Sequence, residues 1–237
     1  EPGEIVEHLG RALGEEPRYR DRSVLVTAGP TREPIDPVRF VGNRSSGRMG
    51  DAVARAAWRR GARVALVSGP TSLPDPPGVD VVRVETAREM HEAVRERIGE
   101  ADVSVFAAAV ADFRPARAHA EKLKRSSTGG QLDLSLAANP DIAAATRSLR
   151  RAGGVAVGFA LETGDLLANA KEKLEAKGFD LLVANDVTEE GAGFEVETNR
   201  VTILDREGEP EELPLLPKDE VAERILDRVG GLLPGEP

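Results

Sequence analysis

The polar segment from residue 27 to residue 50 carries the side chains best suited to chemistry. It begins where an apolar run stops, ends where a helical pattern starts, and contains Arg39, Asn43 and Ser45-Ser46-Gly47. The Ser-Ser-Gly run is expected to cap the helix, whose N-terminal N–H groups would attract an anion. Amide and guanidinium groups beside it suit a phosphate or a carboxyl group being activated. An ordinary turn role for Asn43 is the alternative.

A second group of candidates follows the apolar run 103–110. Asp112 stands just after this run, where doubly wound sheets place ligand contacts. Lys122 and Lys124 lie in the basic, Gly- and Ser-rich segment 121–130, which lacks apolar anchors and predicts a mobile flap. A lysine flap closing over a polyphosphate would neutralise charge in phosphoryl or nucleotidyl transfer. A solvated charge run is the ordinary interpretation of the same residues.

Further candidates lie in the second half of the chain. Lys173 and Lys177 are four residues apart on one face of an expected helix, so they are either solvated, which is commoner, or share an anion. Trp58 and the six Phe are expected mostly in the core, and the alternative for Phe159, at the carboxyl end of an expected strand, is stacking against a nucleotide base.

Composition narrows the class of protein. The chain has 237 residues, a net charge of -9 and a pI near 5.1, which argues against nucleic acid or an anionic membrane as the main partner. It has no Cys and three His, so a disulfide, a thiolate nucleophile, a Cys-ligated zinc site and a His-based triad are disfavoured. No signal segment or transmembrane run occurs, and a cytoplasmic location is expected.

Apolar runs alternate with helical patterns along the chain. Buried strands are expected at 23–28, 63–68, 79–84, 103–110, 154–159 and 179–184, a half-exposed strand at 132–136, and an edge strand at 201–204. Helices are expected at about 47–61, at 86–98 with a capping box, at 139–149 with Pro140 in the first helical position, at 165–177 and at 218–229. This alternation predicts an α/β fold, a Rossmann-like, doubly wound, mostly parallel sheet with helices on both faces and a mobile flap.

The expected domain runs from residue 23 to residue 230. Residues 1–22 resemble a connector from an upstream domain, and residues 231–237 are expected to be frayed. The turn after the first strand reads Ala28-Gly29-Pro30-Thr31, so the glycine fingerprint of dinucleotide enzymes is absent, as is a P-loop. The ordinary NAD interpretation of this fold class thereby loses its main support.

The motifs together resemble one enzyme family. They occupy residues 28–39, 43–50, 108–114, 121–124, 139–142, 158–163 and 184–186. In this order they resemble the phosphopantothenoylcysteine synthetase (phosphopantothenate–cysteine ligase) family of coenzyme A biosynthesis. The resemblance is greatest to the C-terminal half of the bacterial bifunctional proteins that also carry phosphopantothenoylcysteine decarboxylase, and it implies that residues 1–22 connect to that upstream half.

The resemblance implies a two-step ligation. CTP would activate the carboxylate of 4′-phosphopantothenate as an acyl-cytidylate with release of pyrophosphate, and the amine of L-cysteine would then displace CMP. It further implies Mg2+, FMN only in the decarboxylase half, and a homodimer with sites near the subunit interface, with higher assembly in the full bifunctional protein.

The resemblance also implies roles for residues. Asn43 matches the residue that supports the acyl-cytidylate, Lys122 the flap lysine of the activation step, Arg39 a substrate-side arginine, and Ser45-Ser46-Gly47 a phosphate-cradling turn. The matched CTP-binding positions are Asp112, Lys122, Pro140, Asp141, Ile142, Ala143, Phe159, Lys173 and Lys177. The flap pattern Lys-x-Lys-Lys departs at its last position, where Arg125 keeps the charge but can make a bidentate contact. No metal ligand is identified.

Two alternatives remain open at this point. One is a nicotinamide-dependent reductase, which would bind NADH without any effect of CTP. The other is a non-catalytic nucleotide-binding module, which would bind CTP without releasing pyrophosphate.

Overall fold

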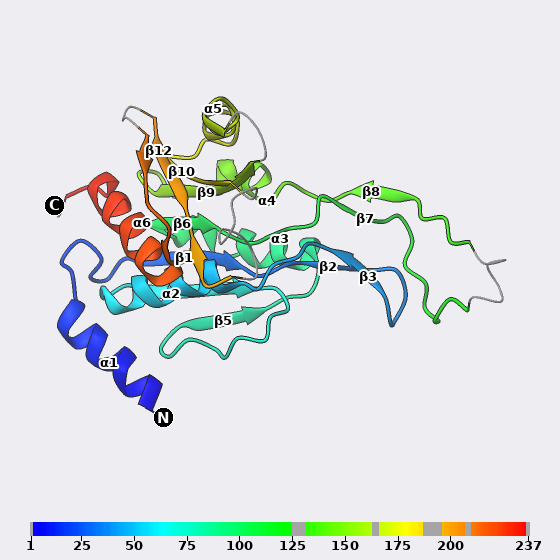
Figure 1. Ribbon diagram of the computed structural model, residues 1–237, viewed down its shortest axis with the longest axis horizontal. Coiled ribbons are helices and arrows are strands. Elements are labelled where there is room, and N and C mark those ends of the chain that lie inside the picture. The colour runs from blue at the N-terminus through cyan, green and yellow to red at the C-terminus, as the bar shows by residue number, and fades with distance from the viewer. Residues whose placement is uncertain (1, 125–130, 163–165, 187–195, 207–209, 236–237) are drawn as a thin grey trace.

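An eight-stranded sheet forms the centre of the computed structural model (Figure 1), which describes residues 2–124, 131–162, 166–186, 196–206 and 210–235. Its strands are β1 (Ser23–Ala28), β4 (Arg63–Ser68), β5 (Asp80–Arg83), β6 (Val103–Phe106), β9 (Val155–Glu162), β10 (Leu181–Asp186), β12 (Val201–Asp205) and β13 (Glu211–Glu212). Their spatial order is β13-β12-β10-β9-β6-β1-β4-β5. The strands from β10 to β5 are parallel, and β12 and β13 add an antiparallel edge.

The parallel strands confirm the predicted doubly wound sheet. The chain runs outward from β1 through β4 and β5, returns to the other side of β1 as β6, and continues through β9 and β10. The direction of winding reverses between β1 and β6, and ligands bind in such sheets beyond the carboxyl ends of strands at this switch point. β6 ends at Phe106, short of the predicted residue 110, and Ala109 makes only an isolated parallel bridge to Pro30.

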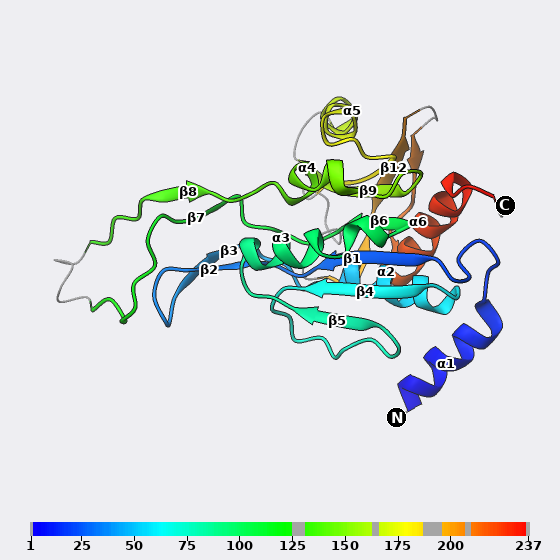
Figure 2. The same cartoon turned by 180° about the vertical axis from the view of Figure 1, so that it is seen from behind.

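Helices cover both faces of the sheet, as predicted. On one face α2 (Arg48–Arg59) and α6 (Lys218–Leu232) share a core with alternate residues of the strands, and α1 (Pro2–Gly14) packs against α2. On the other face lie α3 (Ala87–Arg95), α4 (Ile142–Ala145) and α5 (Leu166–Lys177). Figure 1 has α2 and α6 in front of the sheet, and Figure 2 brings α3 forward. None of the described helices is long and apolar enough to cross a bilayer.

The polar segment after β1 contains a hairpin of β2 (Arg32–Pro34) and β3 (Phe40–Gly42) that was not predicted. Two local expectations about secondary structure need correction. The half-exposed strand expected at 132–136 is β8 (Leu136–Ala138), paired with β7 (Phe113–Pro115). The helix expected at 139–149 divides into α4 and a 3-10 turn at Arg147–Leu149.

Pro140 therefore does not occupy the first helical position. Asp141 caps α4 by accepting the N–H of Ala144 at 3.1 Å, which places Pro140 before the cap. By contrast, the capping box predicted for α3 is confirmed, with Thr86 accepting the N–H of Glu89 at 3.2 Å and Glu89 accepting that of Thr86 at 3.1 Å.

The two hairpins form a projecting arm, which we define as residues 32–42, 113–124 and 131–138. Figures 1 and 2 show it extending well beyond the carboxyl edge of the sheet. Its base is anchored by Glu33, which is 1% exposed and accepts the first N–H of α3, that of Ala87, at 2.9 Å. The arm nevertheless exposes six large apolar side chains: Val38, Phe40, Phe113, Leu132, Leu134 and Leu136.

The ends of the chain depart from the expected boundaries. Tyr19 falls in the expected connector, yet it is fully buried in the core and its O–H donates to the carbonyl of Leu226 in α6. Burial raises the pKa of this phenol. At the other end α6 continues to Leu232, and Leu233 is buried, so the packed core reaches into the range expected to be frayed.

Candidate active site

Three glycines allow α2 to begin directly against the end of β1. Gly29 and Gly47 have φ angles of 75° and 78°, in the left-handed region that glycine adopts readily. A Cβ on Gly47 would lie 3.3 Å from the Cα of Gly29, and a Cβ on Gly50 only 2.5 Å from the Cβ of Ala28. A tight turn, a close backbone approach and close helix–strand packing are the tasks of the glycines in the dinucleotide fingerprint. Here the hairpin segment 30–46 separates the first glycine from the other two and hides the pattern in the sequence.

Side chains from this segment tie β1 to the polypeptide that follows β6. Thr27 Oγ1 accepts the N–H of Ala108 at 3.2 Å, and Thr31 Oγ1 accepts that of Ala111 at 3.0 Å. Asn43 Nδ2 donates to the carbonyl of Val110 at 3.0 Å. The switch point is therefore held by polar contacts, and Asn43 is fixed beside it.

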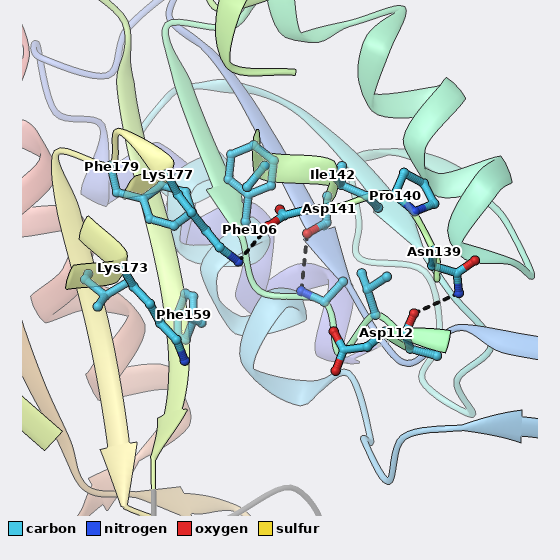
Figure 3. A pocket seen from close by; sticks show the side chains of 16 residues that line it. Phe106, Asp112, Asn139, Pro140, Asp141, Ile142, Phe159, Lys173, Lys177 and Phe179 are labelled. Carbon is cyan, nitrogen blue, oxygen red and sulfur yellow. Dashed lines mark hydrogen bonds and ion pairs between the residues drawn. The ribbon is translucent and has the colours of Figure 1, made fainter. Parts of the chain in front are cut away.

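The first cavity at the switch point has a volume of about 230 Å³ and brings together all the predicted CTP-binding residues except Lys122. Figure 3 shows Lys177 paired with Asp141, at 3.2 Å, while Phe159 and Lys173 lie across the cavity from Asp112. The ion pair explains the spacing of the lysines, because Lys177 binds the cap of α4 and Lys173 faces the cavity one turn earlier. The cavity thus offers aromatic faces, two cations and two carboxylates, one of which, Asp141, is paired with Lys177.

Arg150 supports this cavity from behind and was missed in the sequence. Its guanidinium lies 5.3 Å and 5.4 Å from the ring centres of Phe106 and Phe179, both of which line the cavity. It donates to the carbonyls of Ala143 and Gly178 at 2.7 Å and 2.8 Å, and burial lowers its pKa. Arg150 therefore fixes the position of α4 against the end of α5. An arginine in a polar turn gives no sequence signal of such a role.

A second cavity of about 300 Å³ adjoins the first. It is lined by Asn43, by Ser45-Ser46-Gly47 and by the start of α2, as well as by Asn185 and Asn199. The two cavities share a wall made of Ala108, Val110, Asp112, Phe159 and Lys173. Ligands in the two cavities would meet at this wall.

The cap of α2 differs from the expectation. The N-cap is Gly47, which makes no side-chain cap, and Ser45 Oγ instead accepts the N–H of Gly47 itself at 3.3 Å. The serines thus shape the turn while the following N–H groups of α2 remain directed at the cavity, as at any helix N-terminus. The start of α2 therefore lines the cavity where an anion was predicted to bind, but its N-cap is Gly47 and not a serine.

Arg39 and Lys122 lie on the arm and are not among the residues that line either cavity. Arg39 forms an ion pair with Asp36, and the Asp36 carboxylate also accepts the N–H of Leu123 at 3.1 Å. The Arg39 guanidinium in turn donates to the carbonyl of Leu123 at 2.8 Å. The Arg39 guanidinium, followed by backbone N–H donors, holds the pKa of Asp36 well below its usual range. Leu123 thus attaches the start of the flap to the β2–β3 hairpin, next to the exposed Lys122. Arg125 lies outside the described residues.

Lys218 and Asn199 also line the second cavity, and neither was predicted as a site residue. Lys218 is the first residue of α6 and is 6% exposed, and Asn199 lies in the short strand β11 (Thr198–Asn199) and is 4% exposed. β11 pairs with β14 (Leu216–Pro217), which brings both residues to the cavity. Only this long-range pairing places them there, so no local pattern could have found them.

A doubly wound sheet with two adjoining, lysine-bearing cavities at its switch point is typical of α/β proteins that bind phosphorylated ligands. The chain belongs to the family of the DNA/pantothenate metabolism flavoprotein C-terminal domain, whose model matches residues 19–232. The match begins at the buried Tyr19, in agreement with the packed core.

Known relatives agree with this assignment. Proteins called "Coenzyme A biosynthesis bifunctional protein CoaBC" from Vibrio vulnificus and Escherichia coli are 44% and 43% identical to the chain over 90% and 87% of its length. The chain spans about half of these relatives, 53% and 51% of their lengths. A crystal structure of the C-terminal domain of a CoaBC protein matches 91% of this chain and 97% of its own, with 39% identity and a TM-score of 0.76.

Proposed function

We propose that this chain joins 4′-phosphopantothenate and L-cysteine into 4′-phosphopantothenoyl-L-cysteine, using CTP to activate the acid, as a step of coenzyme A biosynthesis. The observation that carries the proposal is the pair of adjoining cavities at the switch point. The lining of the first cavity suits a nucleotide and that of the second suits another anion, and the two cavities share a wall. The membership of the chain in a pantothenate-metabolism family supports the same chemistry.

The first step takes place at the shared wall. CTP occupies the first cavity, with its base against Phe159 and its phosphates near Lys173 and Lys177. The carboxylate oxygen of the acid, held in the second cavity, attacks the α-phosphorus, and pyrophosphate leaves. Positioning and positive charge supply the catalysis, since the substrate's own carboxylate is the nucleophile.

The second step forms the amide. The amine of cysteine attacks the acyl carbon, the carbon–oxygen bond to CMP breaks, and the proton of the amine passes to solvent. Asn43 suits this step because its Nδ2 is held by the protein, which leaves its Oδ1 to accept from the attacking amine. In the part of the chain that the structure describes, Oδ1 has no hydrogen bond of its own.

Mg2+ fits the site as a phosphate-bound ion. Asp112 lines both cavities and is the carboxylate best placed to contact it, whereas Asp141 is engaged with Lys177 and Ala144. Among the described residues there is no cluster of three or more His, Cys, Asp or Glu side chains that would enclose a metal. Mg2+ is commonly held by one or two carboxylates and substrate phosphates, and it would supply charge neutralisation to the departing pyrophosphate.

A homodimer completes the site in this proposal. Arg39 and Lys122 lie on the arm of their own chain, away from both cavities, and the arm exposes a row of apolar side chains. Covering those side chains with a second copy would carry the arm of one protomer to the cavities of its partner. Arg39 and Lys122 then act in trans on the activated carboxylate and the transferring phosphate.

The N-terminal helix is proposed to connect to an upstream domain. α1 exposes Ile5, Val6, Leu9 and Leu13 on the surface it does not pack against α2. Hydrogen exchange compared between this chain and a bifunctional protein containing it should show new protection in α1. Equal exchange in both would leave α1 as a free appendage.

One assay tests the catalytic proposal. Pyrophosphate and amide product are measured with CTP or ATP, 4′-phosphopantothenate and Mg2+, with and without cysteine. We expect pyrophosphate with CTP and the acid, and amide only when cysteine is added. CTP binding without pyrophosphate release would favour a non-catalytic module, and tight NADH binding unaffected by CTP would favour a reductase.

A further inference from the structure

The second cavity has two distinct ends. At one end it shares Ala108, Asp112, Phe159 and their neighbours with the first cavity. At the other end it shares Arg48 and Lys218 with a smaller cavity of about 210 Å³ that lies outside α2. No residue lines all three cavities. Arg48 and Lys218 therefore mark the end of the second cavity away from the nucleotide.

Two cations, Arg48 and Lys218, stand at this far end, and three carboxylates line the smaller cavity beside it: Asp51, Glu197 and Asp219. Lys218 is 6% exposed, lines the second cavity and donates to the carbonyl of Val196 at 2.6 Å. Arg48 begins α2 and lies 3.8 Å from Glu197. Burial and then Arg48 lower the pKa of Lys218 to about 8, while Glu197 opposes this shift. A bound dianion would offset the cost of keeping both cations close together.

Asn199 is a second, independent sign of a ligand. Its side chain is 4% exposed, and its Oδ1 is buried without a hydrogen-bond partner in the described structure, although the residue lines the cavity. A buried acceptor without a partner costs about 1–3 kcal/mol, so such groups normally have a donor. The missing donor fits a ligand hydroxyl or amide N–H.

We propose that Lys218 and Arg48 hold the phosphate monoester of the acid substrate, and that Asn199 Oδ1 accepts from the hydroxyl or amide beside it. The inference rests on the proposed function for the identity of the acid. 4′-Phosphopantothenate has a carboxylate at one end, a phosphate at the other, and a hydroxyl and an amide between them. Its carboxylate must reach the shared wall to meet the nucleotide, so its phosphate lies at the far end. Lys218 thus determines the choice of a phosphorylated over an unphosphorylated acid.

Calorimetric binding of 4′-phosphopantothenate and of pantothenate, without nucleotide, tests the inference. Lys218→Met should weaken binding of the phosphorylated acid about 10- to 100-fold and leave pantothenate unchanged, because a charge-assisted contact to the phosphate is lost. Lys218→Arg should restore most of the preference. Asn199→Ala should weaken both acids by a similar factor. Lys171→Met is the matched control, since Lys171 is exposed on α5 and lines none of the three cavities, and it should change nothing.

A folded Lys218→Met variant that keeps the wild-type preference for the phosphorylated acid would overturn the inference. If that variant does not fold, Arg48→Met decides, because the Arg48 side chain is 39% exposed and replaceable. It should reduce the preference, and an unchanged preference would overturn the inference equally. The proposed ligase reaction fails separately: a Lys218-dependent preference without pyrophosphate release keeps the phosphate site and removes the activity.

Discussion

Single residues at the switch point combine structural and chemical tasks. Asn43 binds the backbone after β6 and lines the second cavity, so the same amide fixes the loop and faces that cavity. Gly50 lets α2 approach β1 so closely that its N-terminus opens into that cavity. Changes at these positions should separate effects on chemistry from effects on packing.

Asn43→Asp should impair amide formation more than activation. A carboxylate cannot donate to the Val110 carbonyl and would repel the negative charge of the acyl-cytidylate, so we expect a loss on the order of 10²-fold in turnover to the amide. Rapid-quench assays should show the acyl-cytidylate accumulating. Wild-type amide formation in this variant would remove Asn43 from the site.

Gly50→Ala should destabilise the fold. The added Cβ would lie 2.5 Å from the Cβ of Ala28 and 2.9 Å from the carbonyl of Thr27, and such overpacking costs about 1–3 kcal/mol. Denaturant unfolding measures the change. Gly231→Ala in α6 is the control, because nothing lies within 4 Å of its added Cβ, and it should be neutral or slightly stabilising. Equal stability of both variants would refute the close packing.

At the scale of elements, the arm and the flap behave as one unit because of Asp36. One carboxylate oxygen of Asp36 accepts the N–H groups of Val38 and Arg39 in the hairpin turn. The other accepts from the Arg39 guanidinium and from the N–H of Leu123 in the flap. The β2–β3 hairpin therefore determines where Lys122 is presented.

Asp36→Asn should release the flap without unfolding the hairpin. The amide oxygen can keep the turn contacts, but the amide nitrogen cannot accept from Leu123 or Arg39, so hydrogen exchange at the Leu123 amide should speed up about tenfold or more. The control Asp133→Asn changes an exposed arm carboxylate that contacts Gln131 and should leave Leu123 unaffected. Unchanged protection in Asp36→Asn would rule out the clamp.

The same contact gives a pH dependence with a defined sign. Because the folded pKa of Asp36 lies below its ordinary value of 3.8, its stabilisation is complete above that value and is lost as the pH falls below it. Protection of Leu123 should therefore be constant through neutral pH and decline only in strong acid.

At the scale of the whole molecule, the arm is the surface proposed to contact a second copy of the chain. It exposes six large apolar side chains, on hairpins that extend beyond the sheet. Leu136→Glu together with Phe113→Glu should weaken the dimer at least about 100-fold, because burial of each apolar side chain contributes about 1.5–3 kcal/mol. Light scattering should then report a monomer, whereas Leu149→Glu, exposed away from the arm, should stay dimeric. A monomeric wild-type chain would contradict the proposal.

Mixing two inactive variants tests whether the arm acts in trans. Lys122→Gln should lose about 10²-fold in activation, and Asn43→Asp loses amide formation. If Lys122 serves the partner's site, each mixed dimer has one intact site, and an equal mixture should regain about one quarter of wild-type activity. No recovery after subunit exchange would place Lys122 in its own protomer's site.

Local patterns along the chain suffice to predict the architecture and most of the lining of the first cavity. Apolar runs of strand length that alternate with amphipathic helices predict a doubly wound sheet. In such a sheet the residues that follow each parallel strand lie together at the carboxyl edge. Asp112, Asp141 and Phe159 come together for this reason, because each lies at or just beyond a strand end or at a helix start.

The residues of the second cavity that come from β11 and α6 could be placed only from the tertiary structure. The pairing of β11 with β14 brings Lys218 and Asn199 to the second cavity. Arg39 does not line that cavity, because Asp36 binds its guanidinium within the β2–β3 hairpin. Gly29, Gly47 and Gly50 act together although a hairpin separates them in the sequence. Local patterns report contacts between near neighbours along the chain, whereas these groups meet across the fold, where packing, burial and charge determine the geometry.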